Sequence, residues 1–247
     1  MLDKTIHIAS DIHLGIVPRD TEDSFLRWLE YSGAVASDLI LNGDLFDFWF
    51  EFRSGIPKGH ERVLEALRNL IDSGIPVTLM GGNHDWWGGP FLTEEIGVTF
   101  LRNPVIMDLA GFRTFIAHGD GLGRGNFGYR ILRMMLRNRM IIRSFQWLDP
   151  DLGTALGNRI SMTKHRLNSP EPSDGEHIRS RVLQEWGQQK LKDNQELNLV
   201  VLGHTHVPII EEIGSERYYV NVGDWVNHRS YLVLQKDEKP TLKEWKG

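Results

Sequence analysis

The stretch Thr5-Ile6-His7-Ile8-Ala9-Ser10-Asp11-Ile12-His13 joins a short apolar run to a carboxylate and an imidazole. The apolar part is typical of a buried strand of about five residues. Asp11 and His13 are two residues apart, a spacing that places both side chains on the same side of an extended chain. This stretch therefore predicts a strand that ends in a polar site where two side chains can share a metal ion.

Four further blocks repeat this combination of an apolar run and polar side chains, at residues 43–47, 82–85, 118–120 and 203–206. The apolar runs at 5–9, 38–42, 76–80 and 112–117 predict strands, and helical spacing of apolar residues at 23–29 and 63–71 predicts helices between them. Alternating strands and helices indicate an α/β layered core. Each block thus follows the predicted end of a strand, and we expect the blocks to converge on one rim of a sheet.

Residues from about 122 to 194 interrupt this pattern with a predicted helical insertion. A glycine-rich segment leads into one helical stretch that ends near Trp147, a second helix runs from Pro150 to about Arg166, and a polar helix ends near Lys192. Strands are expected again at 197–202, 207–213, 217–222 and 230–235. We predict a single domain, residues 1–247, that contains this insertion.

The composition restricts both the class of protein and the kind of metal site. The 247 residues suffice for one large domain, and the absence of cysteine excludes disulfides and thiolate ligands. With no basic start followed by an apolar stretch, and no run of about 18 apolar residues, we expect a cytoplasmic protein. The net charge of −5 combines +7 over residues 122–169 with −12 elsewhere. This basic segment favours an anionic partner and not general affinity for nucleic acid.

Seven side chains are candidate metal ligands with oxygen or nitrogen donors: Asp11, His13, Asp44, Asn83, His118, His204 and His206. Such a set suits Mn²⁺, Fe²⁺ or Zn²⁺ better than Ca²⁺, which prefers oxygen alone. Asp44 has two carboxylate oxygens and is able to bridge two cations. Each block alone is also compatible with a turn that has no chemistry, but five blocks in this order favour a metal site. The histidines expected to be structural or solvated are His7, His60, His177 and His228.

The five blocks resemble those of the calcineurin-like metallophosphoesterase family. The resemblance implies a four-layer αββα sandwich in which two divalent cations activate water for attack on phosphorus. It implies one cation held by Asp11, His13, Asp44 and His206, and a second held by Asp44, Asn83, His118 and His204. It also implies that His84 is a catalytic residue facing the substrate, with Asp47 as its orienting carboxylate. Asp85 and Asp120 are expected to support neighbouring turns or ligands.

The first predicted helix of the insertion has two unlike faces. Arg130, Arg133 and Arg137 lie on one side, and apolar residues occupy the other. One interpretation packs the apolar side on the core and leaves the arginines in water. The other makes the insertion an apolar lid with a basic rim, which holds acyl chains while arginines contact phosphates or anionic lipid headgroups. The many apolar residues between 134 and 147 favour the second.

With this insertion, the chain is similar over nearly its whole length to the UDP-2,3-diacylglucosamine pyrophosphatases of lipid A biosynthesis. The similarity implies cleavage to UMP and 2,3-diacylglucosamine 1-phosphate, with Mn²⁺ as the expected metal and Fe²⁺, Zn²⁺ or Mg²⁺ as alternatives. It also implies peripheral contact with the cytoplasmic face of the inner membrane. The candidate substrate-binding residues are Asn83, His84, Asn126, Arg130, Ser161, Lys164, His165, Arg166 and His204. The four between 161 and 166 are equally compatible with a plain surface helix.

Two positions depart from that family and keep other hypotheses open. Its members commonly have Arg where this chain has His84, and an acidic residue where it has Asn126. His84 matches the general metallophosphoesterase pattern instead, so a phosphoesterase acting on nucleotides, phosphoproteins or nucleic acid is the alternative. A scaffold without catalytic activity is a third hypothesis, against which the presence of every expected ligand argues.

Overall fold

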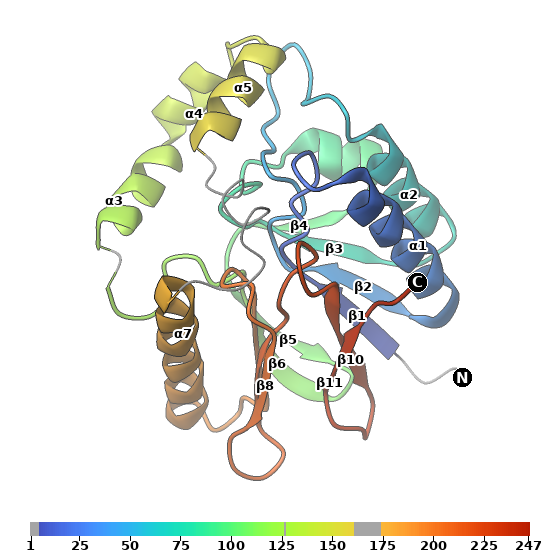
Figure 1. Ribbon diagram of the computed structural model, residues 1–247, viewed down its shortest axis with the longest axis vertical. Coiled ribbons are helices and arrows are strands. Elements are labelled where there is room, and N and C mark those ends of the chain that lie inside the picture. The colour runs from blue at the N-terminus through green and yellow to red at the C-terminus, as the bar shows by residue number, and fades with distance from the viewer. Residues whose placement is uncertain (1–4, 126, 161–173) are drawn as a thin grey trace.

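The computed structural model describes residues 5–125, 127–160 and 174–247, and two β-sheets form its centre (Figure 1). The strands of the first sheet are β1 (Thr5–Ala9), β2 (Asp38–Leu41), β3 (Val77–Met80), β4 (Thr99–Leu101), β10 (Ser230–Gln235) and β11 (Thr241–Glu244). Those of the second are β5 (Val105–Leu109), β6 (Phe112–Ile116), β7 (Leu199–Leu202), β8 (Ile209–Glu212) and β9 (Tyr218–Asn221). The spatial orders are β11-β10-β1-β2-β3-β4 and β5-β6-β7-β9-β8.

The two sheets pack on each other through apolar side chains that alternate along their strands. Ile6 and Ile8 of β1 share a buried cluster with Leu199 and Val201 of β7, whereas Val200 lies in a different cluster on the opposite face. Successive side chains of a strand point to opposite faces, so strands that are apolar throughout are buried on both sides. This explains why the central strands stand out in the sequence as continuous apolar runs.

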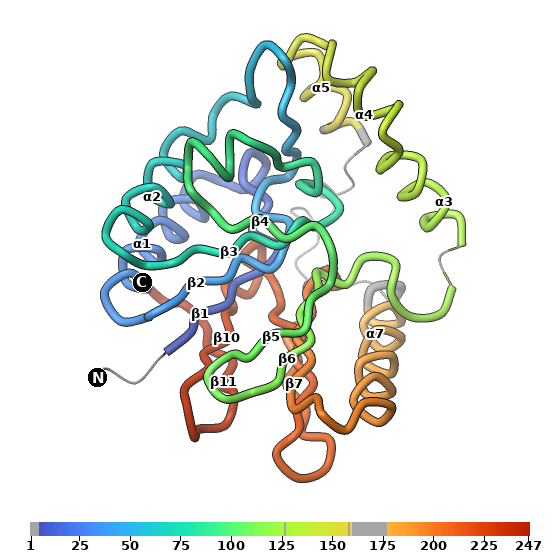
Figure 2. The backbone as a smooth tube through the Cα atoms, turned by 180° about the vertical axis from the view of Figure 1, so that it is seen from behind, coloured from blue at the N-terminus to red at the C-terminus, as the bar shows by residue number. Residues whose placement is uncertain are grey.

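Helices cover the outer faces of both sheets. α1 (Arg19–Val35) and α2 (Glu61–Asp72) pack on the first sheet, and α7 (Asp174–Asp193) packs on the second, as Figure 2 shows from behind. α2 buries Val63, Leu64, Leu67 and Leu70, a spacing that places them on one face of the helix. The layers are therefore helix, sheet, sheet and helix, which confirms the αββα sandwich expected from the sequence.

The chain between β6 and β7 forms helices, with boundaries that differ from the prediction. The stretch expected to continue to Trp147 is two helices, α3 (Phe127–Leu136) and α4 (Arg139–Phe145), because the Asn138 side chain accepts a hydrogen bond from the backbone N–H of Met140 and begins a new helix. α5 covers Pro150–Ile160, and the rest of its predicted length lies outside the described residues. No helix in the described ranges is long and apolar enough to span a membrane.

Four elements were absent from the sequence prediction. They are β4, β5, β11 and a π-helix, η1 (Phe91–Ile96). β4 and β11 lie at the two edges of the first sheet, and β5 lies at an edge of the second. Most side chains of all three strands are exposed or half-buried, so these strands lack the continuous apolar pattern that marks the buried strands.

His7 provides a test of the packing between β1 and α1. Burial, assisted by Lys243, lowers the pKa of His7 from 6.5 to about 4, and its Nδ1 lies 2.9 Å from the Ser32 hydroxyl. The unfolded chain therefore binds a proton between pH 6.5 and 4 that the folded protein does not, so stability falls as the pH falls through this range. We expect that His7→Gln removes about 2–3 kcal/mol of the decrease in the free energy of unfolding between pH 7 and pH 4.5.

The measurement is the free energy of unfolding by urea at pH 7 and pH 4.5, with a chelator present to exclude metal effects. His177→Gln, on the exposed surface of α7, is the control and should keep the wild-type pH dependence. Equal pH dependence in His7→Gln and wild type would contradict the assignment of this titration to His7.

Candidate metal centre

The seven candidate ligands all follow the carboxyl ends of parallel strands. Asp11 and His13 follow β1, Asp44 follows β2 and Asn83 follows β3, three strands that run parallel in the first sheet. His118 follows β6, and His204 and His206 follow β7, which are parallel in the second sheet. The rims of the two packed sheets meet there, and this brings residues almost 200 positions apart into contact, such as His13 and His206.

The backbone at this rim adopts conformations that residues other than glycine rarely adopt. Positive φ values occur at five candidate ligands: Asp11 (56°), His13 (54°), Asp44 (53°), His204 (69°) and His206 (61°). Such conformations cost energy and persist where surrounding structure enforces them, most often at functional sites. Gly82 shows how closely the turns approach, since a Cβ at that position would collide with Oδ1 of Asp44.

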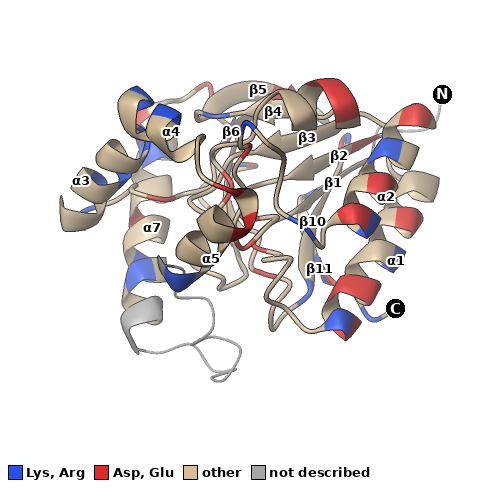
Figure 3. Cartoon of the chain, turned by 90° about the horizontal axis from the view of Figure 1, so that it is seen from above, with Lys and Arg blue, Asp and Glu red and all other residues tan. Residues whose placement is uncertain are grey.

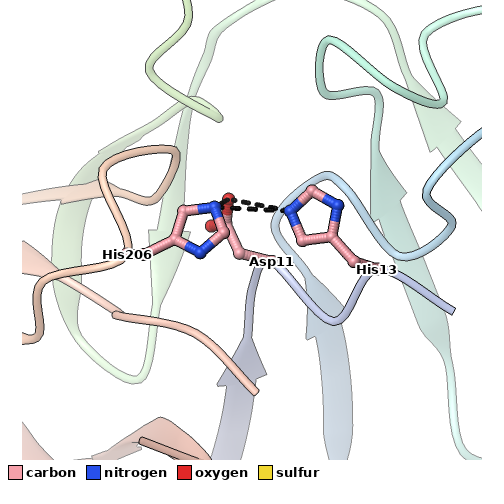
Figure 4. A group of neighbouring side chains, drawn as sticks. All are labelled: Asp11, His13 and His206. Carbon is pink, nitrogen blue, oxygen red and sulfur yellow. Dashed lines mark hydrogen bonds and ion pairs between the residues drawn. The ribbon is translucent and has the colours of Figure 1, made fainter. Parts of the chain in front are cut away.

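Asp11, His13 and His206 form the first group of candidate ligands (Figure 4). One ligand atom from each lies within 4.8 Å of the others. Nε2 of His206 is 3.2 Å from Oδ1 of Asp11 and 3.3 Å from Nε2 of His13. All three side chains are buried. They belong to two different sheets, so this group exists only in the folded protein.

Asp44, His118 and His204 form the second group, with the same limit of 4.8 Å between ligand atoms. Nε2 of His118 lies 3.2 Å from Oδ2 of Asp44 and 3.2 Å from Oδ1 of Asn83. The same Oδ2 lies 3.9 Å from Nε2 of His13 in the first group. Asp44 thus stands between the two groups, but it faces them with one oxygen, because its Oδ1 accepts a hydrogen bond from the backbone N–H of His84.

In the first group, acceptor atoms of neighbouring side chains face one another, and this arrangement fits a cation bound between them. When neutral His206 donates from Nδ1 to Asp224, at 2.9 Å, its Nε2 carries a lone pair. That lone pair faces the buried Oδ1 of Asp11, which has no hydrogen-bond partner among the residues that the structure describes. Two acceptors 3.2 Å apart need a proton or a metal ion between them. The residues present therefore fit a divalent cation with nitrogen and oxygen ligands.

Opposite charges in the two groups shift one another's pKa values. Burial lowers the pKa of His206, but Asp11 and Asp224 outweigh it and raise the pKa to about 9. Burial raises the pKa of Asp11, but His206 outweighs it and lowers the pKa to about 2. His118 likewise keeps the pKa of Asp44 well below its usual range against the effect of burial. Without a cation, protons on imidazoles balance the carboxylates, and a binding cation has to displace them.

The geometry around His84 and Asp47 differs from the expected carboxylate–imidazole pair. Nδ1 of His84 donates to the backbone carbonyl of Asp47 at 2.7 Å, while the Asp47 carboxylate lies 3.1 Å from Nδ1 of His13 and 3.8 Å from that of His84. The chain turns at Asp47 so that its carbonyl contacts His84 and its carboxylate contacts His13. Asp47 therefore holds His84 through its backbone, and its charge lies closer to His13.

Asp85 and Asp120 support the surroundings of the candidate ligands. Asp85 is fully buried, and its carboxylate accepts backbone hydrogen bonds from Gly82 (2.7 Å), Asp44 (3.3 Å) and Leu45 (2.7 Å), which hold the two turns together. Burial, reinforced by Asp44, raises the pKa of Asp85 to about 6. Asp120 has a different role, because it connects the rim to the insertion.

Two arginines of α3, Arg133 and Arg137, point toward the core, whereas Arg130 is exposed. Oδ2 of Asp120 lies 3.1 Å from Nε of Arg133 and 3.1 Å from Nη2 of Arg137, and it accepts a hydrogen bond from the Tyr129 hydroxyl at 3.2 Å. Arg130 donates to the carbonyls of Gly121 and Gly123. No residue of α3 is buried, and its apolar side chains face outward. The interpretation with the apolar side packed on the core is therefore wrong, and Figure 3 shows the basic residues gathered on α3 and α4.

The helices α4 and α5 rest on aromatic side chains of the loop after β2. The Phe145 ring of α4 lies 4.8 Å from Phe50 and 5.8 Å from Phe52. Gly153 of α5 leaves room for Phe52, and Gly157 leaves room for Phe48. Five of the substrate-binding candidates lie outside the described residues: Asn126, Ser161, Lys164, His165 and Arg166.

The remaining histidines have surroundings of three kinds. His60 is buried against Phe46 and Trp49, and burial lowers its pKa to about 4. His177 is exposed on α7. His228 was expected to be structural or solvated, and its Nδ1 lies 3.0 Å from Oδ1 of Asp224. Asp224 was not among the predicted site residues, although it follows strand β9 as the other site residues follow their strands.

The chain matches a known protein family and several proteins that align with it over most of their length. The model of a family described as calcineurin-like phosphoesterase matches residues 4–208. The UDP-2,3-diacylglucosamine hydrolase of Porphyromonas gingivalis (strain ATCC BAA-308 / W83) is 28% identical over 243 residues, which cover 92% of this chain and 93% of that protein. The protein of the same name from Pseudomonas fluorescens (strain SBW25) is 30% identical over 242 residues, covering 95% and 92%. A crystal structure of a single mutant of Vps29 from Entamoeba histolytica is 15% identical, with coverage of 96% and 89% and a TM-score of 0.46.

Proposed function

This chain belongs to the calcineurin-like phosphoesterase family, and from that premise we propose that it cleaves the pyrophosphate of UDP-2,3-diacylglucosamine. It is a hydrolytic enzyme of this family. The observation that carries the proposed substrate is that relatives named for this hydrolysis match more than nine tenths of the chain, the insertion included. The products would be UMP and 2,3-diacylglucosamine 1-phosphate.

We assign the seven rim residues to two divalent cations, with Mn²⁺ as the proposed metal. The first would be held by Asp11, His13, Asp44 and His206, and the second by Asp44, Asn83, His118 and His204. When bound, such a pair supplies neutralisation of the phosphoryl oxygens and a water of lowered pKa. The protein contributes fixed donors at His13, His118 and His206, because the Nδ1 atoms of these rings are engaged by Asp47, Asn42 and Asp224 in that order.

The insertion would bind the acyl chains and contact the cytoplasmic face of the inner membrane. Between residues 127 and 152, six of its apolar side chains are more than half exposed: Phe127, Met134, Met135, Met140, Trp147 and Leu152. So large an apolar surface on a helical segment is typical of a site that meets lipid. The basic charge of the same segment would attract anionic headgroups.

The test of the substrate is hydrolysis by the purified enzyme with Mn²⁺ in H₂¹⁸O. Attack on the uridine-linked phosphorus predicts ¹⁸O in UMP and none in the lipid phosphate, as determined by mass spectrometry. Bis(p-nitrophenyl) phosphate and a UDP-sugar without acyl chains serve as comparison substrates. Turnover of the chromogenic diester without turnover of the diacylated substrate would overturn the proposal and favour a phosphoesterase of other specificity, the alternative that His84 supports.

If the insertion contacts lipid, a substitution of Met140, which is 76% exposed on α4, should weaken binding to vesicles. Met140→Asp places a charge in the apolar surface and should lower the fraction of protein that sediments with phosphatidylglycerol-containing vesicles severalfold. Ile210→Asp, at an exposed position of β8 in the second sheet, is the matched control and should sediment like wild type. Equal sedimentation of all three proteins would exclude the insertion as the lipid contact.

A further inference from the structure

The loop from β9 to β10 carries Asp224, a buried carboxylate directly behind a candidate ligand. Oδ2 of Asp224 accepts from Nδ1 of His206 at 2.9 Å. Its Oδ1 accepts from the backbone N–H groups of Asn227 and His228, each at 3.0 Å, and lies 3.0 Å from Nδ1 of His228. Asp224 is fully buried, so its charge is compensated by these donors and not by water.

The same loop also supports Asp11. The backbone N–H of Trp225, the next residue, donates to the carbonyl of Asp11 at 3.1 Å, and the Trp225 ring is buried against Phe25 and Trp28. The loop connects the second sheet to the first at the point where the first ligand group is assembled. Two of the three members of that group are therefore positioned by one short segment.

We propose that Asp224 is a positioning residue that fixes His206 as a ligand through Nε2, and that it makes the first group hold its cation more tightly than the second. Because Asp224 accepts the Nδ1 proton, the lone pair of the neutral ring resides on Nε2, which faces Asp11 and His13. The proposal rests on the metal centre of the proposed function and not on its lipid substrate.

The difference between the groups follows from what lies behind each imidazole. In the first group both histidines have a carboxylate partner at Nδ1, Asp224 for His206 and Asp47 for His13 at 3.1 Å. In the second, the partner of His118 at Nδ1 is the neutral backbone carbonyl of Asn42, at 3.0 Å. A carboxylate at the far nitrogen makes an imidazole a stronger donor to a metal, and its loss typically costs about 10–100-fold in affinity.

Asp224→Asn tests this with a defined physical change. The two backbone N–H groups require an acceptor at the Oδ1 position, so the amide oxygen stays there and the NH₂ group turns toward His206. His206 then has to accept at Nδ1 and carry its proton on Nε2, where it blocks ligation. In competition titrations of the full-length protein with Zn²⁺ or Mn²⁺ against a chelator, we expect one of two equivalents to bind about 10–100-fold more weakly.

His228→Gln is the matched control, because it changes the same loop but leaves the contact between Asp224 and His206 in place. It should bind both equivalents with wild-type affinity. Wild-type affinity for both equivalents in Asp224→Asn, or an equal loss in both, would overturn the proposal. A wild-type protein that binds no divalent cation would refute the proposed function itself, which is a distinct result.

A second measurement needs no variant. Imidazole ¹⁵N chemical shifts of the Zn²⁺-loaded wild-type protein distinguish a ring bound through Nε2 from one bound through Nδ1. We expect His206 to carry hydrogen on Nδ1 and zinc on Nε2. Zinc on Nδ1, or a His206 ring that does not respond to zinc, would overturn the proposal even if Asp224→Asn failed to fold.

Discussion

Asp44→Ala is expected to remove both divalent cations and to lower kcat/KM by about 10³-fold or more, which corresponds to about 4 kcal/mol of transition-state stabilisation. The reason is the position of one oxygen. Oδ2 of Asp44 lies 3.2 Å from Nε2 of His118 and 3.9 Å from Nε2 of His13, so the two ligand groups share it. Removing this carboxylate leaves each group without the negative charge that lies between them.

Asp44→Asn separates the charge from the turn geometry. The amide oxygen can still accept the backbone N–H of His84, as Oδ1 does in the wild type, so the turn should persist while the charge is lost. Metal content by plasma mass spectrometry and kcat/KM are the two readouts, with thermal unfolding as the check on folding. Two tightly bound equivalents in Asp44→Ala would contradict its position as the shared ligand.

The location of the ligands at strand ends was predictable because it follows from local sequence. An apolar run followed by Asp11 and His13 specifies both a buried strand and the polar turn after it. Parallel strands then bring such turns to one edge, whatever their separation along the chain. The αββα layers follow from the same runs, because strands buried on both faces need a sheet or a helix on each side.

The partners of the imidazoles were not predictable in this way. Asp224 reaches His206 only because the loop after β9 crosses from the second sheet to the first, and no local pattern encodes this contact. Asp47 has a carbonyl and a carboxylate, and which histidine each one reaches depends on a turn of a few residues. Such choices are made by tertiary packing, which sequence spacing does not contain.

The orientation of α3 illustrates the same limit. Helical spacing identified a basic and an apolar face, but periodicity does not say which face packs inward. The structure turns Arg133 and Arg137 inward because Asp120, 6% exposed, offers them a carboxylate. A buried carboxylate without such partners would be costly. The outward apolar face is thus a consequence of an ion pair formed at the rim.

Substitution of His84 should lower activity without removing metal, in contrast to substitution of a ligand. Its Nδ1 donates to the Asp47 carbonyl at 2.7 Å, so Nε2 is the nitrogen turned toward Asp44, at 3.9 Å from Oδ2, and the side chain is 17% exposed. One ligand atom each of His13, Asp44 and His84 also lies within 4.8 Å of the others, and His84 is the more accessible of the two imidazoles in this third group. This position suits a residue that meets the substrate phosphoryl group and, when protonated, donates to it.

His84→Gln is therefore expected to lower kcat by about 10²–10⁴-fold, the range typical of a lost general acid, while two equivalents of metal remain bound. Glutamine keeps a hydrogen-bonding side chain but cannot transfer a proton or carry a charge. The comparison with Asp44→Ala is decisive, since that variant should lose metal and activity together. His84→Arg restores a cation without an acid, so its recovery of activity would assign His84 to charge stabilisation. Loss of one metal equivalent in His84→Gln would instead make His84 a ligand, and unchanged kcat would exclude it from the reaction.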